Sequence, residues 1–348
     1  MGAERRWRVA RFDILINPVF DERLRAEAGI ELALSPIPKS EADVARALDS
    51  ADIYHVSSAR DEMAQYAFVT PALLERSPHL LAVSTYGAGY DSVDVEACTR
   101  AGVIVMNQAG ANRDSVAEHA IALILGVVHR LVECDRKMRA SRGFAREAVM
   151  GHEVKGMVLG LVGLGHVGRT VAAMAKVFGM DVIATDPYLD AGEMQRRGAR
   201  KVELDELLAA SDIVSLHCPR DAKTVGMIGA AQYARMKRGS YFISTARGGI
   251  HDEMALAESL EAGHLAGAGL DVWQPEPPPL DHPLLALDNV FATYHTAGVT
   301  HEARRNIATM GAEQIVDLVR GNKPPRLVNP EAWDAFAERS RQRERTAA

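Results

Sequence analysis

Short apolar runs alternate with amphipathic stretches along almost the whole chain. The runs predict β-strands, and the stretches between them, such as Glu41–Leu48, predict α-helices. This alternation is typical of βαβ units, in which helices connect parallel strands. The runs fall into two series, so the pattern predicts two α/β units in one chain. The strands of the first series are Phe12–Ile16, Glu31–Leu34, Asp52–Val56, Leu80–Thr85 and Val103–Met106, and those of the second are Val158–Val162, Val182–Thr185, Ile213–His217, Tyr241–Thr245, Ala266–Leu270 and Val290–Tyr294.

The longest helical pattern runs from about Asp114 to Arg139, between the two series. Its apolar positions cover a wide arc of the helix, which indicates burial on more than one side. Two interpretations stay open: a connector between domains that also forms a dimer surface, and an ordinary core helix. Beyond the last strand, the segment from Glu338 to Ala348 is charged and poor in apolar residues, which predicts a frayed tail.

A glycine-rich turn, Gly163 to Gly168 (GLGHVG), follows the first strand of the second series. The first glycine of such a turn permits a tight bend, the second lets the backbone approach a pyrophosphate, and the third lets the helix pack on the strand. The next strand ends at Asp186, 18 residues after Gly168, close to the interval of about 20 for an acid that binds the ribose hydroxyls. The complete order of parts predicts a dinucleotide site.

Asp186 also predicts which nicotinamide cofactor binds. A carboxylate accepts a hydrogen bond from the ribose 2′-hydroxyl but repels a 2′-phosphate. Pro187 and Tyr188 follow it and supply no cation that would offset the repulsion. NAD is therefore expected rather than NADP.

Composition and charge narrow the class of protein. The chain has 348 residues, more than one typical domain, and its 47% hydrophobic and 25% charged residues are ordinary for a soluble globular protein. The formal net charge of −6 argues against a nucleic-acid or anionic-membrane partner. Three cysteines without CxxC spacing fit a reduced protein, and residues 4–8 (ERRWR) lack the apolar region of a signal peptide. A cytoplasmic location is expected.

Arg247, Glu276 and His295 each lie in a segment that follows a different strand of the second series. Ligands of open parallel sheets bind outside the carboxyl ends of the strands, so the three side chains are expected at the edge where a nicotinamide would lie. No metal is needed for this arrangement. Each residue alone has an ordinary structural explanation, but their joint position favours a catalytic site.

These residue types suit the reduction of a 2-keto acid by hydride. The keto oxygen needs a proton, and a histidine that titrates near neutrality, His295, can give it. Glu276 beside the imidazole is expected to raise the pKa of His295 and to fix its orientation. The Arg247 guanidinium offers a rigid fork to a substrate carboxylate and can polarise the adjacent carbonyl. In the oxidative direction His295 is the base.

Other histidines and a cysteine are not expected to transfer protons. His217 ends an earlier strand and is expected to face the cofactor, with Cys218 packed near the nucleotide. His152, His251 and His301 have no partner that the sequence identifies, so they are expected at the surface.

The first series has an anion-binding signal of its own, residues 84–91 (STYGAGYD), with Gly87 and Gly89 directly after a strand. Closely spaced glycines allow backbone N–H groups to face an anion. A substrate carboxylate held there, across a cleft from Arg247, would place its keto carbon between two domains. The alternative is a structural glycine turn.

With these motifs in order, the chain resembles the D-isomer-specific 2-hydroxyacid dehydrogenases over roughly residues 50 to 330. Residues 86–91 look like the substrate loop of that family, and residues 115–119 (SVAEH) like the start of its connecting helix. The turn at 163–168 with Asp186 resembles its NAD fingerprint. Residues 246–249 (ARGG), residues 271–277 (DVWQPEP) and His295 resemble the segments that carry its catalytic Arg, Glu and His.

The resemblance implies an NAD-dependent homodimeric enzyme with a Rossmann-like dinucleotide-binding domain inserted in a flavodoxin-like substrate domain. It implies the substrate domain at residues 1–111 and 298–335, the NAD-binding domain at residues 112–297, and a charged tail at residues 336–348. The implied cofactor contacts are Gly163, Gly165, His166, Val167, Gly168, Asp186, Cys218, Thr245 and Asp271, and the implied substrate contacts are Gly87, Ala88, Gly89, Asn112 and Arg247.

Within the family, Glu276 argues against the formate dehydrogenases, which have glutamine there. The D-3-phosphoglycerate dehydrogenases look closest, but Ser57, Ser58 and Asp114 stand where those enzymes often carry cations. No C-terminal regulatory extension is expected, since the chain ends soon after Asn329. We therefore expect interconversion of a small 2-keto acid and its D-2-hydroxy acid, with glyoxylate, hydroxypyruvate or phosphoglycerate as substrates. The alternative is an NAD(H)-sensing corepressor-type binding protein on the same fold.

Overall fold

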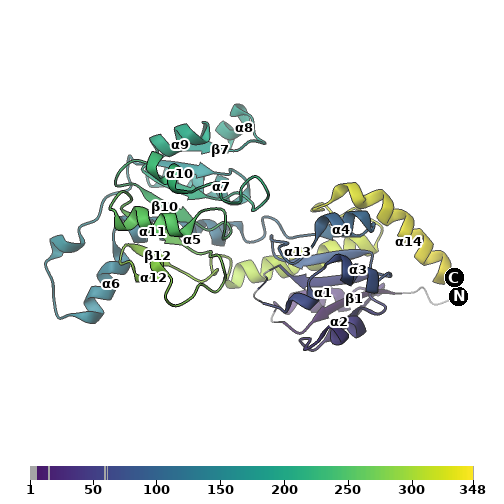
Figure 1. Cartoon of the computed structure of the whole chain (residues 1–348). Helices are drawn as coiled ribbons and strands as arrows, with labels where there is room; N and C mark the ends of the chain where they lie inside the picture. The colour runs from purple at the N-terminus through teal and green to yellow at the C-terminus, as the bar shows by residue number, and fades with distance from the viewer. Residues whose placement is uncertain (1–5, 15, 59, 61, 348) are drawn as a thin grey trace. The chain divides into compact units, whose positions relative to one another are not determined.

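The computed structural model of the chain describes residues 6–347 apart from residues 15, 59 and 61. It divides into two compact units: Met1–Asn112 together with His301–Ala348, and Arg113–Thr300. Because the first unit is discontinuous in sequence, the second is inserted into it (Figure 1). This confirms the predicted α/β fold with an inserted domain. Of the residues used above, Glu4, Arg5, Leu15 and Ala348 lie outside the described part of the chain.

The first unit is built on a five-stranded parallel sheet. Its elements are β1 (Trp7–Phe12), α1 (Val19–Arg25), β2 (Ile30–Ser35), α2 (Glu41–Leu48), β3 (Ile53–Ser57), η1 (Gln65–Ala67), α3 (Pro71–Arg76), β4 (Ala82–Tyr86), α4 (Val95–Arg100), β5 (Ile104–Met106), α13 (His301–Val319), η3 (Pro330–Ala332) and α14 (Trp333–Ala347). The strand order β2-β1-β3-β4-β5 is the flavodoxin-like order, as predicted.

The strands of this sheet are buried on both faces, which explains why they read as continuous apolar runs. Alternate residues of a strand point to opposite faces, and here they join separate hydrophobic clusters. Ile53 and Ile104 join the cluster that contains residues of α1 and α13. Tyr54 and Val105 join the cluster that contains residues of α2, α3 and α4. Helices therefore cover both sides of the sheet.

The first strand lies earlier than the apolar run at Phe12–Ile16 predicts, because β1 ends at Phe12. Arg8 and Arg11 interrupt the apolar pattern of the observed strand and conceal it. Arg11 is buried, and its guanidinium donates to the two carboxylate oxygens of Asp21 at 2.9 and 2.6 Å. A bidentate pair of this kind allows a charge to lie in the interior.

The C-terminal residues form a helix, so the prediction of a frayed tail over residues 338–348 is wrong as far as Ala347. The helix α14 docks through Arg343, whose guanidinium donates to the two carboxylate oxygens of Asp52 at 2.6 and 2.7 Å. The same guanidinium lies 4.4 Å from the centroid of the Trp7 ring. Phe336 of the same helix also packs in a hydrophobic cluster of this unit, but the contacts of Arg343 are ionic and aromatic, and a count of apolar residues does not predict them.

The second unit contains a seven-stranded parallel sheet. Its elements are α5 (Arg113–Val128), α6 (Leu131–Ala140), η2 (Arg146–Val149), β6 (Val158–Val162), α7 (His166–Val177), β7 (Asp181–Thr185), α8 (Ala191–Arg196), β8 (Arg200–Lys201), α9 (Leu204–Ala210), β9 (Ile213–Leu216), α10 (Ala230–Arg235), β10 (Tyr241–Ser244), α11 (Glu253–Glu261), β11 (Gly267–Leu270), α12 (Pro283–Ala286) and β12 (Val290–Ala292). The order β12-β11-β10-β9-β6-β7-β8 is the Rossmann order with one further strand at an edge.

The helix predicted from Asp114 to Arg139 is in fact two helices, α5 and α6, bent by 61°. Arg130, at the break, has a left-handed φ of 55°. The helix α5 is largely buried and packs on α7, β10 and β11, as the core-helix interpretation requires. By contrast, α6 and the segment after it project from the body of this unit (Figure 1). No single helix among the described residues is long and apolar enough to cross a membrane, and α5 with α6 would reach that length only as a bent pair.

The docking of α14 can be tested at Arg343. Replacing Arg343 by Ala leaves the buried carboxylate of Asp52 without its ionic fork, and breaking such a pair typically costs about 3–5 kcal/mol. We expect the free energy of unfolding of the first unit to fall by at least about 2 kcal/mol, measured by urea denaturation. The control Arg341→Ala removes an exposed pair with Glu338 on the same helix and should be near neutral. Equal effects of the two changes would contradict the proposed docking.

Candidate active site

The strand order of the second unit creates a crevice at the carboxyl end of β6. This strand lies between β7 and β9. The strands that follow it in sequence are divided between its two sides, with β7 and β8 on one side and β9 to β12 on the other. Dinucleotides bind at such a switch point in open parallel sheets. The glycine-rich turn follows β6 directly and therefore lies at this crevice.

The three glycines of the turn meet different surroundings. A Cβ added to Gly163, whose φ is +93°, would lie 2.9 Å from backbone atoms of His217 and Cys218. A Cβ added to Gly168 would lie 2.2 Å from the carbonyl oxygen of Gly163. A Cβ added to Gly165 would meet nothing within 4 Å. The first and third glycines are thus required by the protein backbone, whereas the second borders open space that suits a pyrophosphate.

The neighbouring groups also suit a dinucleotide. The helix α7 begins at His166 without a side-chain cap, so its amino end can present backbone N–H groups to phosphate. Asp186 follows β7, and its carboxylate accepts hydrogen bonds from Leu164 N and Tyr188 N, both at 3.0 Å. Asp186 therefore joins the glycine turn to the end of β7. This is the position predicted for the acid that binds the ribose hydroxyls.

The structure brings two of the predicted catalytic residues into contact. Nδ1 of His295, which follows β12, lies 2.9 Å from Oε2 of Glu276, which follows β11. The other oxygen, Oε1 of Glu276, accepts from Trp273 N at 2.9 Å. Arg247 follows β10 and lies close enough that its charge acts on both Glu276 and His295. All of these residues belong to the second unit and lie at the carboxyl ends of adjacent strands.

Electrostatics favour the charged forms of both side chains, the imidazolium of His295 and the carboxylate of Glu276. Burial alone would lower the pKa of His295, but the hydrogen bond and the charge of Glu276 outweigh burial, and the pKa lies above its ordinary value. Burial would likewise raise the pKa of Glu276, but the hydrogen bond and charge of His295 hold it below the ordinary value. An imidazolium next to a carboxylate is a proton donor that stays protonated to a higher pH than a free imidazole does.

The backbone at His295 is held in an unusual conformation by Asp271. His295 has a φ of +46°, and its N–H donates to the Asp271 carbonyl at 2.6 Å. The Asp271 side chain is 1% exposed. Its Oδ1 accepts from Thr293 Oγ1 at 2.7 Å and from Thr296 N at 2.8 Å, and its Oδ2 accepts from Ala297 N at 3.0 Å. Asp271, predicted as a cofactor contact, thus anchors the turn that carries the histidine.

Sequence reasoning missed a histidine that supports this turn. Nε2 of His119, on α5, lies 2.9 Å from Thr293 Oγ1 and 3.6 Å from Asp271 Oδ1. The motif SVAEH contained His119, but nothing in the local sequence linked it to a strand end far along the chain. Its contact is a product of the packing of α5 against the sheet.

His217 and Cys218 lie beside the glycine turn, where their backbone atoms face Gly163. Nε2 of His217 lies 2.9 Å from Ser215 Oγ, and Nδ1 lies 3.5 Å from Thr245 Oγ1. Burial lowers the pKa of His217 to about 4 and raises the pKa of Cys218 to about 11. A neutral imidazole and a protonated thiol supply neither an acid nor a nucleophile near neutrality.

The expectation that His251 lies at the surface is wrong. Its side chain is buried, its ring packs against Phe242 with centroids 5.0 Å apart, and Nδ1 lies 3.1 Å from the hydroxyl of Tyr233. Burial lowers the pKa of His251 to about 4. His301, at the start of α13, and His152 are both exposed, as expected.

In the first unit, the predicted substrate loop follows β4. Gly87 has a φ of +129°, and its N–H donates to Gln108 Oε1 at 2.7 Å. That N–H is therefore used within the loop, and Gly87 contributes its conformation. The Ala88 carbonyl accepts from Asn107 Nδ2 at 2.8 Å, which further fixes the loop. Asn112 is the last residue of this segment of the unit and is partly buried.

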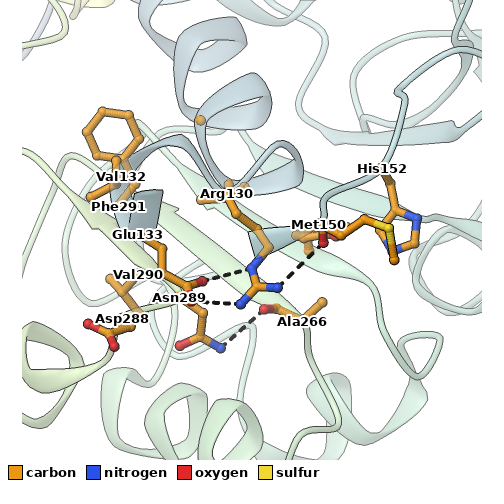
Figure 2. A pocket seen from close by; sticks show the side chains of 13 residues that line it. Arg130, Val132, Glu133, Met150, His152, Ala266, Asp288, Asn289, Val290 and Phe291 are labelled. Atoms are coloured by element: carbon orange, nitrogen blue, oxygen red, sulfur yellow. Dashed lines mark hydrogen bonds and ion pairs between the residues drawn. The ribbon is translucent and has the colours of Figure 1, made fainter. Parts of the chain in front are cut away.

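A pocket of about 290 Å³ lies elsewhere in the second unit (Figure 2). It is lined by residues at the amino ends of β10 and β12, opposite to the ends that carry the predicted site. In Figure 2, Arg130 donates to the two carboxylate oxygens of Glu133 at 2.8 and 2.7 Å and to the Met150 carbonyl at 3.5 Å. This pocket contains none of the predicted site residues.

Comparison with known proteins fits this geometry. Residues 121–297 match the model of the "D-isomer specific 2-hydroxyacid dehydrogenase, NAD binding domain". The chain belongs to this family. The match covers the inserted unit almost entirely and confirms the predicted NAD-binding domain.

Several known proteins are also similar to most of the chain. A D-3-phosphoglycerate dehydrogenase from Archaeoglobus fulgidus is 40% identical over 75% of this chain, but the match spans only 49% of that relative. A glyoxylate reductase from Korarchaeum cryptofilum is 40% identical over 74% of this chain and 79% of its own length. The structure of a glyoxylate reductase from Paecilomyes thermophila is 27% identical, with a TM-score of 0.83, and covers 94% of this chain and 99% of its own.

The contact between Glu276 and His295 can be tested by titration. Glu276→Gln removes the anion that raises the pKa of His295, so we expect the midpoint of its titration to fall by about one pH unit. Histidine NMR of the cofactor-free protein measures the midpoint, with the signal assigned by its loss in His295→Asn. Asp281→Asn, an exposed acid in the same loop, is the control and should leave the midpoint in place. An unchanged midpoint in Glu276→Gln would count against the pairing.

Proposed function

We propose that the chain is an NAD-dependent oxidoreductase that interconverts a small 2-keto acid and its D-2-hydroxy acid. The observation that carries this proposal is the contact between His295 and Glu276, with Arg247 nearby, at the same edge of the sheet as the dinucleotide crevice at the end of β6. When bound, the nicotinamide donates or accepts the hydride at the substrate carbon.

The residues divide the remaining work. Nδ1 of His295 is engaged in the hydrogen bond with Glu276, so the proton for the keto oxygen is carried on Nε2. That proton goes to the oxygen as the hydride reaches the carbon, which balances the reduction; in the oxidative direction Nε2 takes the proton back. Arg247 binds the substrate carboxylate and polarises the keto group. Asp271 keeps the imidazole in place by holding its turn.

We assign the cofactor and substrate contacts on the same basis. The glycine turn with His166 and Val167 would hold the pyrophosphate, and Asp186 the ribose. Cys218, Thr245 and Asp271, at neighbouring strand ends, would flank the nicotinamide half. Ala88 and Gly89 with Asn112 would contact the substrate from the first unit. The names of the relatives favour glyoxylate or a phosphoglycerate-type acid as substrate, and hydroxypyruvate is the third candidate from the sequence.

We further propose that the chain functions as a cytoplasmic homodimer, without a nucleic-acid or membrane partner. The projecting α6 and the segment after it expose Leu131, Met138 and Met150, and exposed apolar side chains gathered on one arm suit a self-complementary interface. The three cysteines form no disulfide, which suits a reducing compartment.

The dimer can be tested at Met138. Replacing Met138 by Glu puts a charge in the proposed interface, where the same position of the second copy would bring a like charge close. We expect a shift from dimer to monomer in size-exclusion chromatography with light scattering. Val177→Glu, an exposed apolar residue at the end of α7, is the control and should stay dimeric. A monomeric unmodified protein would overturn this part of the proposal.

Turnover tests the activity. We expect oxidation of NADH by at least one acid among glyoxylate, hydroxypyruvate and its phosphorylated form, followed by absorbance. His295→Asn should lower kcat by about 10²–10⁴-fold, since general acid catalysis contributes that much, and should leave NADH binding intact. Asn tolerates the left-handed conformation at this position, so the turn should survive. Tight NADH binding without turnover of any acid would instead support an NAD(H)-sensing corepressor-type protein.

A further inference from the structure

A second carboxylate–imidazole pair lies behind the turn that carries Glu276. Glu253 is the first residue of α11, and its Oε2 lies 3.0 Å from Nε2 of His282. The two side chains are only 7% and 8% exposed. A buried acid and a buried imidazole in contact are costly to desolvate, and the proposed reaction uses neither of them.

Glu253 is joined to the Glu276 turn through the backbone. Its Oε1 accepts from Gln274 N at 2.7 Å, while the preceding N–H, that of Trp273, donates to Glu276 Oε1 at 2.9 Å. Two consecutive N–H groups of the turn are thus held by two different carboxylates. A change at Glu253 is transmitted to Glu276 across a single peptide unit.

His282 completes the support. Its Nδ1 accepts from Leu284 N at 3.3 Å, so a neutral ring carries its proton on Nε2, the atom that faces Glu253. The ring also packs edge-on against Trp273, with centroids 5.7 Å apart. Trp273 in turn donates from Nε1 to the Thr293 carbonyl at 2.8 Å, two residues before His295. The pair therefore touches the supports of both catalytic side chains.

The pair can change charge in the neutral range. Burial raises the pKa of Glu253 to about 7, with the Gln274 N–H opposing that rise. Burial lowers the pKa of His282, so its ring stays neutral. Glu253 is then the group that titrates. The titratable and charged groups that face the pair are Asp252 and Glu276 around Glu253, Tyr233 on α10, and Asp281 beside His282.

We propose that Glu253 and His282 are positioning residues that hold the turn bearing Glu276 and thereby set the acid strength of His295. The anion of Glu253 binds the Gln274 N–H more strongly than the neutral acid does. It also places negative charge near Glu276, which favours the imidazolium of His295. His295 would therefore stay protonated, and the enzyme active in reduction, to a higher pH than the charge of Glu276 alone allows. Only this last consequence rests on the proposed function.

The decisive experiment compares Glu253→Gln with Glu258→Gln, an exposed acid on the same helix. Gln keeps an acceptor for the Gln274 N–H but carries no charge. In histidine NMR of the cofactor-free protein, we expect Glu253→Gln to lower the His295 midpoint by about half a pH unit and Glu258→Gln to leave it unchanged. Equal midpoints in the three proteins would overturn the proposal. This readout needs no turnover, so failure of the proposed activity cannot be mistaken for failure here.

A second variant approaches the pair from the other side. His282→Asn keeps a side chain that can cap α12 but removes the ring nitrogen that lies 3.0 Å from Glu253 Oε2, so Glu253 should hold its own proton to higher pH. We expect the His295 midpoint to fall in the same direction as in Glu253→Gln, and by less. No shift in this variant would also overturn the proposal, even if Glu253→Gln does not fold.

Turnover separates positioning from a merely structural role. In Glu253→Gln we expect kcat for reduction to match the unmodified protein below pH 7 and to fall several-fold above it, with NADH affinity unchanged. Gln and the neutral acid carry the same charge, so the two proteins differ only at pH values where Glu253 of the unmodified protein is ionised. The loss of kcat in the variant must therefore depend on pH. A loss of the same size at every pH would contradict the proposed role.

Discussion

A buried carboxylate, that of Asp271, constrains the turn on which the proposed chemistry depends. A histidine with a left-handed backbone is unfavourable, and such conformations typically cost about 1–3 kcal/mol. The turn persists because Asp271 offers three charge-assisted acceptor contacts and a carbonyl, all directed at residues 293–297. Since the imidazole is rigidly placed, its pairing with Glu276 is a fixed property of the unit. The contact then determines how readily His295 holds a proton.

The sheet explains how residues so far apart in sequence come to share a site. Adjacent parallel strands β10, β11 and β12 end at one edge, and each delivers one of the residues Arg247, Glu276 and His295. The same edge carries the glycine turn at the end of β6. Helices and loops then refine these positions: α5 supplies His119, and α11 supplies Glu253. The strands position the candidate catalytic side chains, and residues of the surrounding helices adjust the electrostatics of those side chains.

The sequence predicted those parts that depend on local pattern or on sheet topology. The glycine turn, Asp186 and the three strand-end residues follow from periodicity and from the rule for parallel sheets. It could not predict contacts that packing alone creates. Glu253 reads as an ordinary acid at the start of a helix, and His282 as a loop residue beside a proline; only the folded chain buries them together. His251 was misjudged for the same reason, because burial of a polar side chain is a tertiary outcome.

The pairing of Arg343 with Asp52 has a consequence for the synthesis of the chain. The first unit draws on segments before and after the inserted unit, whereas the inserted unit is continuous and its last residue is Thr300. Domains form as units while the chain emerges from the ribosome. The inserted unit can therefore fold first, while β1 to β5 wait with their face for α13 uncovered and Asp52 without its guanidinium. Assembly of this protein is ordered by its topology, because the first unit is complete only when α13 and α14, which follow the inserted unit, have emerged.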